Sequence, residues 1–197
     1  MKRSVLSEEE LSLLGALGRL PLHRVFSPVW EGIAEFGNRL VAFLPDECVL
    51  VKGDNRLATR IQVSLEPPEE PSNLELAAQD LGSVTNLEVL ETLVGFSPWY
   101  EASPTDILGV PIPAGRGASV MYLHPDNPAA EDISAKALSS GGTGFASVHL
   151  GVRFRTDGDR DVTFYTDGVG YFVHLAIDEG LKRLSENVLR YRPLAGP

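Results

Sequence analysis

The hydrophobic positions near the N-terminus recur with the period of a helix. Ser7 is followed three residues later by Glu10, the capping-box pattern in which each side chain binds the backbone of the other residue. Pro21 lies at the far end and cannot continue a helix. Between them runs a stripe of leucines at helical spacing: Leu11, Leu13, Leu14, Leu17 and Leu20. The pattern predicts an N-terminal helix.

Helical spacing returns in the middle and at the end of the chain. Ser72 with Glu75 and Thr85 with Glu88 repeat the capping-box pattern, and apolar residues follow each pair at intervals of three or four. We therefore expect central helices over 73–81 and 86–94, a short helix over 129–138 and a C-terminal helix over 179–190.

Strict alternation of apolar and polar residues predicts strands elsewhere. The clearest case is 145–177, where apolar residues alternate from Val148 to Phe154 and again at Val162 and Phe164. Shorter runs lie between 24 and 65, over 107–112 and over 119–123. The predicted fold is α+β, a single domain over 1–197. In it, N-terminal, central and C-terminal helices pack on a largely antiparallel sheet. We interpret the proline-rich segment 66–73 as an internal connector and not as a domain boundary.

Two Asp-Gly turns divide the strands of the 145–177 meander, and apolar alternation predicts how each pairs. Phe154 must oppose Val162 if the apolar faces are to merge. This makes 157–159 a three-residue loop, for which a type I turn with a bulge is expected. The same argument gives a two-residue turn at Asp167-Gly168, with Val162 opposite Val173.

These registers place Arg155, Asp161 and His174 in one row across the polar face of the meander. A carboxylate beside a histidine can orient it for acid–base work, and His149 is expected on the same face. The alternative is a row of cross-strand ion pairs with no activity. Because no nucleophile is recognisable nearby, we predict no catalytic residue and keep these three as candidates only.

The motifs of metal and cofactor sites are missing. Asp157, Asp159 and Asp161 alternate like the start of a calcium loop, but that loop needs glycine at position six and glutamate at position twelve. Val162 and Gly168 occupy those positions. There is no G-x-x-x-x-G-K-S/T, G-x-G-x-x-G or H-E-x-x-H motif, and Cys48 is the single cysteine. We expect no metal, no cofactor and no disulfide.

The charge of the chain is concentrated in one segment. The 197 residues carry a net charge of -10, and from Ile61 to Gly115 there are nine acids and no lysine or arginine. Such a surface repels nucleic acid and attracts basic proteins, although a solvated face that only aids solubility is the alternative. No apolar run is long enough for a membrane span, and we expect a cytoplasmic protein.

Aromatic residues lie inside this acidic segment and suggest an interface. We predict a non-catalytic, acidic protein-binding module, of the inhibitor, immunity or chaperone kind, that docks on a basic protein through 66–106. A small-molecule-binding protein or small enzyme, with its site on the polar face of 145–177, is the alternative, and a homo-oligomer remains open. The expected partner-binding residues are Glu88, Glu91, Trp99, Tyr100 and Glu101.

Overall fold

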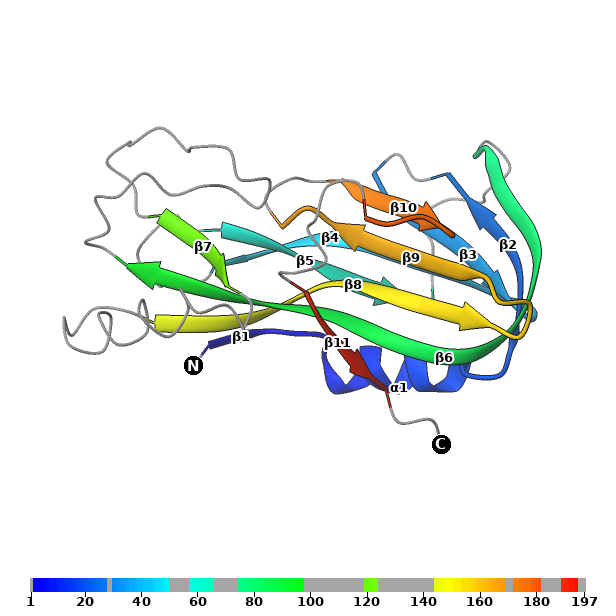
Figure 1. Ribbon diagram of the computed structural model, residues 1–197, viewed down its shortest axis with the longest axis horizontal. Coiled ribbons are helices and arrows are strands. Elements are labelled where there is room, and N and C mark those ends of the chain that lie inside the picture. The colour runs from blue at the N-terminus through cyan, green and yellow to red at the C-terminus, as the bar shows by residue number, and fades with distance from the viewer. Residues whose placement is uncertain are drawn as a thin grey trace.

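Antiparallel strands make up most of the chain in the computed structural model (Figure 1). It describes residues 2–27, 30–49, 57–65, 74–97, 119–123, 144–168, 172–181 and 189–194. The elements are β1 (Lys2–Ser4), α1 (Glu8–Leu17), β2 (Pro21–Phe26), β3 (Gly32–Phe36), β4 (Arg39–Val49), β5 (Leu57–Ser64), β6 (Leu76–Ser97), β7 (Ser119–Leu123), β8 (Gly144–Thr156), β9 (Asp161–Thr166), β10 (Val173–Ile177) and β11 (Arg190–Pro193).

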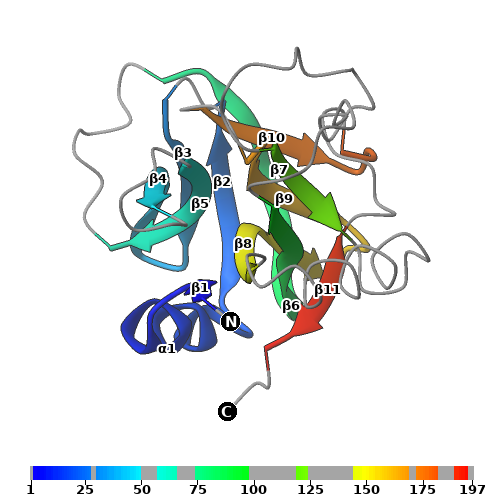
Figure 2. The same cartoon turned by 90° about the vertical axis from the view of Figure 1, so that its left-hand side faces the viewer.

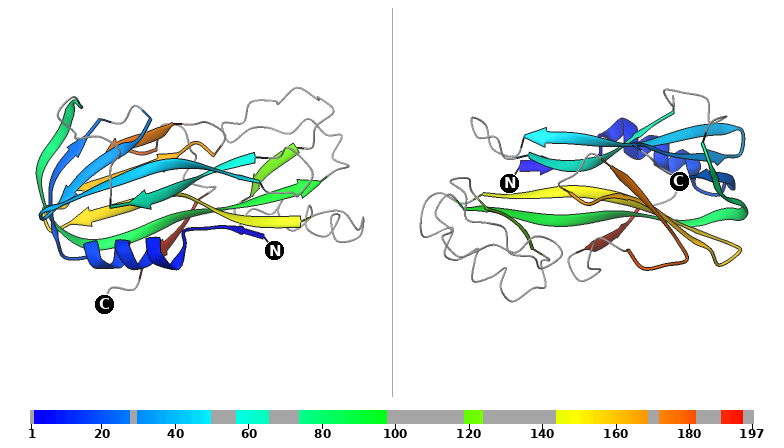
Figure 3. Two further views of the ribbon diagram at one scale, coloured as in Figure 1. Left: turned by 180° about the vertical axis from the view of Figure 1, so that it is seen from behind. Right: turned by 90° about the horizontal axis from the view of Figure 1, so that it is seen from above.

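The strands form two layers that face each other. The hydrogen-bonded order is β10-β9-β8-β6-β2-β3-β4-β5, with β7 and β11 also paired to β6 and β1 paired to β8. Seen from above, β2 to β5 lie in one layer and β6, β8, β9 and β10 in the other (Figure 3). The described residues therefore form a β-sandwich.

The long strand β6 joins the layers. Its first part pairs with β2 and the rest with β8. Near the end of the part paired with β2, Asp80 and Gly82 have positive φ angles of 53° and 96°, the left-handed backbone that bends a strand. A side chain at Gly82 would lie 2.3 Å from the Asp157 carboxylate. Only glycine therefore fits this bend without displacing the neighbouring hairpin.

Aromatic rings from both layers fill the space between them. Phe43 of β4 stacks on Phe164 of β9 with centroids 4.2 Å apart, and Phe36 of β3 meets Phe154 of β8 at 4.9 Å. All four rings are fully buried. Large buried aromatics dominate the energetics of a core of this kind, so these rings define how the layers pack.

The predicted N-terminal helix is confirmed as α1. Both hydrogen bonds of the capping box between Ser7 and Glu10 are present. Leu14 and Leu17 are fully buried in the main core. Figures 1 and 2 show the helix along one side of the sandwich, where it contacts β5 and β6.

The α+β prediction is wrong, because α1 is the only helix among the described residues. The segments 76–81 and 86–94, expected to be helical, belong to strand β6. Leu81, Val84 and Leu87 are three residues apart, yet all belong to the core. The left-handed Gly82 and a register shift between Val84 and Asn86 explain this spacing. A bulge adds one residue to a strand and turns a period of two into three.

The other predicted helices lie mainly outside the described residues. Arg190, the expected end of the C-terminal helix, instead begins β11, while 182–188 are not described. The expected helix over 129–138, the strand over 107–112 and the connector 66–73 also lie outside the described residues. The strand predicted over 119–123 is confirmed as β7.

Candidate functional site

The first turn of the meander has the predicted register. Phe154 lies opposite Val162, and Arg155 lies opposite Asp161. The loop has three residues, because Thr156 and its partner Arg160 close it with a backbone hydrogen bond of 3.0 Å. Its last residue, Asp159, has a φ angle of 56°, which is the left-handed bulge position of such loops. Both the pairing and the bulge are confirmed.

The second turn of the meander does not have the predicted register. Val162 pairs with Ile177 instead of Val173, a shift of four residues, and His174 pairs with Tyr165. An even shift keeps every side chain on its own face. The apolar pattern is satisfied equally well by both registers, so it could not distinguish them.

This shift breaks up the predicted row of Arg155, Asp161 and His174. The residue beside Asp161 is Asp178, whose carboxylate accepts from the Asp161 N–H at 2.8 Å. His174 lies elsewhere, with its Nε2 atom 3.9 Å from a carboxylate oxygen of Asp167. His149 is buried, and its Nδ1 atom accepts from the Leu6 N–H at 3.0 Å. The structure therefore brings Arg155 and Asp161 together but places neither histidine with them.

A network of ion pairs crosses the outer face of β6, β8 and β9. Arg153 donates from Nε to Asp161 at 2.7 Å and also from Nη2 to the same oxygen. Glu88 of β6 has a carboxylate oxygen 3.9 Å from both Arg153 and Arg155. Burial lowers the pKa of Arg153, but the hydrogen bond and charge of Asp161 outweigh it and raise the pKa overall. The network therefore stabilises the charged form of Arg153.

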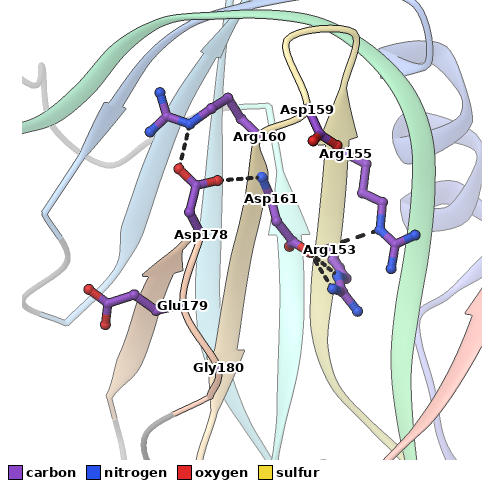
Figure 4. Close-up of a pocket in the computed structure, with 8 residues that line it drawn as sticks. All are labelled: Arg153, Arg155, Asp159, Arg160, Asp161, Asp178, Glu179 and Gly180. Carbon is purple, nitrogen blue, oxygen red and sulfur yellow. Dashed lines mark hydrogen bonds and ion pairs between the residues drawn. The ribbon is translucent and has the colours of Figure 1, made fainter.

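A polar groove of about 430 Å³ opens over this network. Figure 4 shows Arg153 reaching toward Asp161 on one side, and Arg160 reaching toward Asp178 on the other. Arg155, Asp159, Glu179 and Gly180 complete the lining. The lining holds no serine, cysteine or histidine. The groove presents four carboxylates and three guanidinium groups, so it can bind charged groups.

The expected partner-binding residues fall into two groups. The side chain of Glu88 is only 12% exposed, because it turns toward the two arginines. Glu91 is half-buried, and its backbone lies opposite that of Arg190 in the antiparallel pairing of β6 with β11. Trp99, Tyr100 and Glu101 lie outside the described residues.

Sequence reasoning missed the exposed start of β6. Glu75, Leu76, Ala77, Gln79 and Asp80 are all exposed. The acidic composition indicated this region, but the apolar spacing predicted a helix where the structure has a strand.

A second missed feature is an aromatic pair, Trp30 and Phe172. The two rings are stacked with centroids 5.0 Å apart, and the residues are 62% and 42% exposed. Nothing in the sequence signals this pair, because 142 positions separate its members.

The fold and the site define a β-sandwich with a charged groove and an acidic, exposed strand. Comparisons with protein-family models, with curated proteins and with solved structures find no match. Among the described residues, no group of three or more histidine, cysteine, aspartate or glutamate side chains is placed to hold a metal ion. No helix in the same residues is long and apolar enough to cross a membrane.

Proposed function

We propose that this chain is a non-catalytic binding protein that docks on a basic protein partner through the region 66–106, as an inhibitor or chaperone would. The observation that carries the proposal is the exposed start of β6. Glu75 and Asp80 project there, and no lysine or arginine occurs between Ile61 and Gly115. Unopposed exposed carboxylates attract and orient a basic protein surface.

Internal ion pairing separates the available acids from the occupied ones. Glu88 is held by arginines of this chain, so it supports the charged network rather than a partner. Glu75 and Asp80 make no ion pair within the described residues. They therefore replace Glu88 as the leading contacts, together with Leu76, which is 44% exposed. Trp99, Tyr100 and Glu101 stay in the proposal because two are aromatic, one is acidic and all three lie in the acidic segment of the sequence.

The experiment compares two double charge reversals. Glu75→Lys/Asp80→Lys removes the proposed contacts, and Glu8→Lys/Glu9→Lys makes the same change of net charge on exposed residues of α1. Each tagged protein is incubated at low salt with extract from its native host, and bound proteins are eluted with salt and identified by mass spectrometry. Pairwise binding to the purified candidate is then measured.

Basic proteins should elute from the wild type and from the α1 variant, and the β6 variant should lose them. Pairwise association should slow as salt rises, because exposed charges are screened. The proposal fails if the two variants bind equally, or if the captured proteins are not basic.

A second candidate function is the binding of a small charged molecule in the groove. It is favoured by Arg155, whose guanidinium is half-exposed and whose nearest carboxylate oxygens lie 3.9 Å away. Five N–H donors on a planar group suit a carboxylate ligand. Amino acids and dicarboxylates should then raise the melting temperature of the wild type but not of Arg155→Gln. Equal shifts in both proteins would exclude this site.

A further inference from the structure

We infer that the partner binds by adding a strand to the open edge of β6 over residues 76–80. The inference rests on the proposed function and specifies how the basic partner is held. Strand addition uses backbone hydrogen bonds for affinity and side chains for selectivity.

The edge opens where the neighbouring strand ends. Strand β8 stops at Thr156, which lies opposite Val84 of β6. The hairpin between β8 and β9 covers the residues of β6 just before Val84 on this edge. Asp157 donates its N–H to the Ser83 carbonyl at 2.9 Å, and its carboxylate accepts from the Ser83 N–H at 2.8 Å. The Thr156 hydroxyl reaches the Leu81 carbonyl at 2.5 Å. Leu81 is the residue nearest the N-terminal end of β6 that the hairpin contacts through these hydrogen bonds.

On the N-terminal side of Leu81, residues 76–80 of β6 form a strand with only one paired edge among the described residues. Strand β2 pairs with residues 76–83 on the other side. Within the described part of the chain, no strand pairs with residues 76–80 on the β8 side. Figure 1 shows this end of β6 extending beyond the tip of the β8–β9 hairpin. Unpaired backbone groups of an edge strand are a template for another extended chain.

Charge selects the kind of chain that fits this edge. Glu75 and Asp80 stand at the two ends of the open stretch, and the one nearby cation of β2, Arg24, is paired with Glu35. A basic extended segment complements these acids, and exposed Leu76 offers contact to its apolar side chains. A second copy of this chain would fit poorly, because antiparallel self-pairing brings acidic residues together.

Three synthetic peptides test strand addition on the full-length protein. A peptide of alternating lysine and valine can form a basic strand. One of alternating lysine and proline keeps the charge but lacks half of the backbone donors. One of alternating glutamate and valine keeps the strand propensity and reverses the charge. Binding is measured by calorimetry at low salt, and hydrogen exchange locates the peptide on the protein.

The lysine–valine peptide should bind at least about tenfold more tightly than the other two, since one lacks the backbone donors and the other the charge. It should slow exchange of amides in 76–80. Glu75→Lys/Asp80→Lys should weaken it about tenfold, as expected for losing and reversing two exposed charge contacts. The matched Glu8→Lys/Glu9→Lys variant should bind it as the wild type does.

Other outcomes overturn the inference in distinguishable ways. Equal binding of both lysine peptides would leave a basic partner in place but exclude strand addition. If the peptide slows amide exchange in β10, the strand at one end of the sheet order, and not in β6, the inferred docking edge is wrong. Absence of binding by the lysine–valine peptide would also exclude strand addition, while the host-extract experiment would still decide the proposed function. Concentration-dependent dimers abolished by Glu75→Lys/Asp80→Lys would identify a second copy as the occupant.

Discussion

Replacing Glu10 by glutamine should weaken the attachment of α1 to the sandwich. The carboxylate is buried and joins the helix to the edge strand β5. One oxygen accepts from the Ser7 N–H at 2.7 Å and from Arg60 at 3.0 Å. The other accepts from the Val63 N–H at 3.0 Å. Arg60 continues the chain of contacts to Asp46 of β4 at 2.7 Å.

The size of the effect follows from these three hydrogen bonds. A hydrogen bond to a charged group contributes roughly 1.5–3 kcal/mol, and a buried donor without an acceptor costs about 1–3 kcal/mol. Glutamine keeps the shape and one acceptor oxygen, but its amide N–H groups face donors on the other side. We expect Glu10→Gln to lower the free energy of unfolding by about 2–3 kcal/mol, a large share of the roughly 5–15 kcal/mol typical of a native protein.

The same group makes stability depend on pH. Burial raises the pKa of Glu10, but hydrogen bonds from Ser7, Val63 and Arg60 and the charge of Arg60 outweigh it and hold the pKa below its ordinary value of 4.5. A carboxyl group with a depressed folded-state pKa stabilises the protein fully above its unfolded pKa. This contribution is lost as the pH falls through the folded-state value. The difference between wild type and Glu10→Gln should therefore shrink in acid.

Urea unfolding followed by circular dichroism, at neutral pH and at several pH values below the ordinary value of 4.5, measures both effects. Glu9→Gln is the matched control, because Glu9 is exposed on the same turn of α1. The reasoning is refuted if Glu10→Gln at neutral pH lies within about 0.5 kcal/mol of the control, the usual range of surface substitutions. It is also refuted if wild type and Glu10→Gln lose stability in parallel as the pH falls.

Two further pairs of substitutions test the packing and the turn. Gly151→Ala should destabilise by about 2–4 kcal/mol, because the new methyl would lie 2.5 Å from the Phe164 carbonyl oxygen and 2.7 Å from the Tyr165 side chain. Gly15→Ala in α1, with nothing within 4 Å, should stabilise by about 0.5–1 kcal/mol, and equal urea midpoints for the two would contradict this. Asp159→Val should cost about 1–2 kcal/mol because of the positive φ angle, whereas Asp159→Gly should be neutral. Thermal unfolding distinguishes the pair, and an unchanged melting temperature in Asp159→Val would exclude strain at this position.

Two of the three candidate site residues could be placed from the sequence. Arg155 and Asp161 were expected to face each other, and they do, because a short loop leaves few ways to merge two apolar faces. His174 was misplaced because registers that differ by an even number of residues satisfy the same pattern. The prediction of which acidic residues are available to a partner was also wrong for Glu88. Whether Glu88 or Glu75 is free depends on arginines of another strand, and one strand's sequence does not indicate its neighbours.

The sequence by itself determined the features that depend on neighbouring residues. The capping box of α1, the three-residue loop before β9 and the acidic segment from Ile61 to Gly115 all follow from short patterns. Tertiary structure alone decided that 76–97 is a strand. A bulged strand and a helix share the same apolar spacing, and only pairing with β2 and β8 distinguishes them. That pairing also exposes the edge at 76–80, because β8 ends at Thr156.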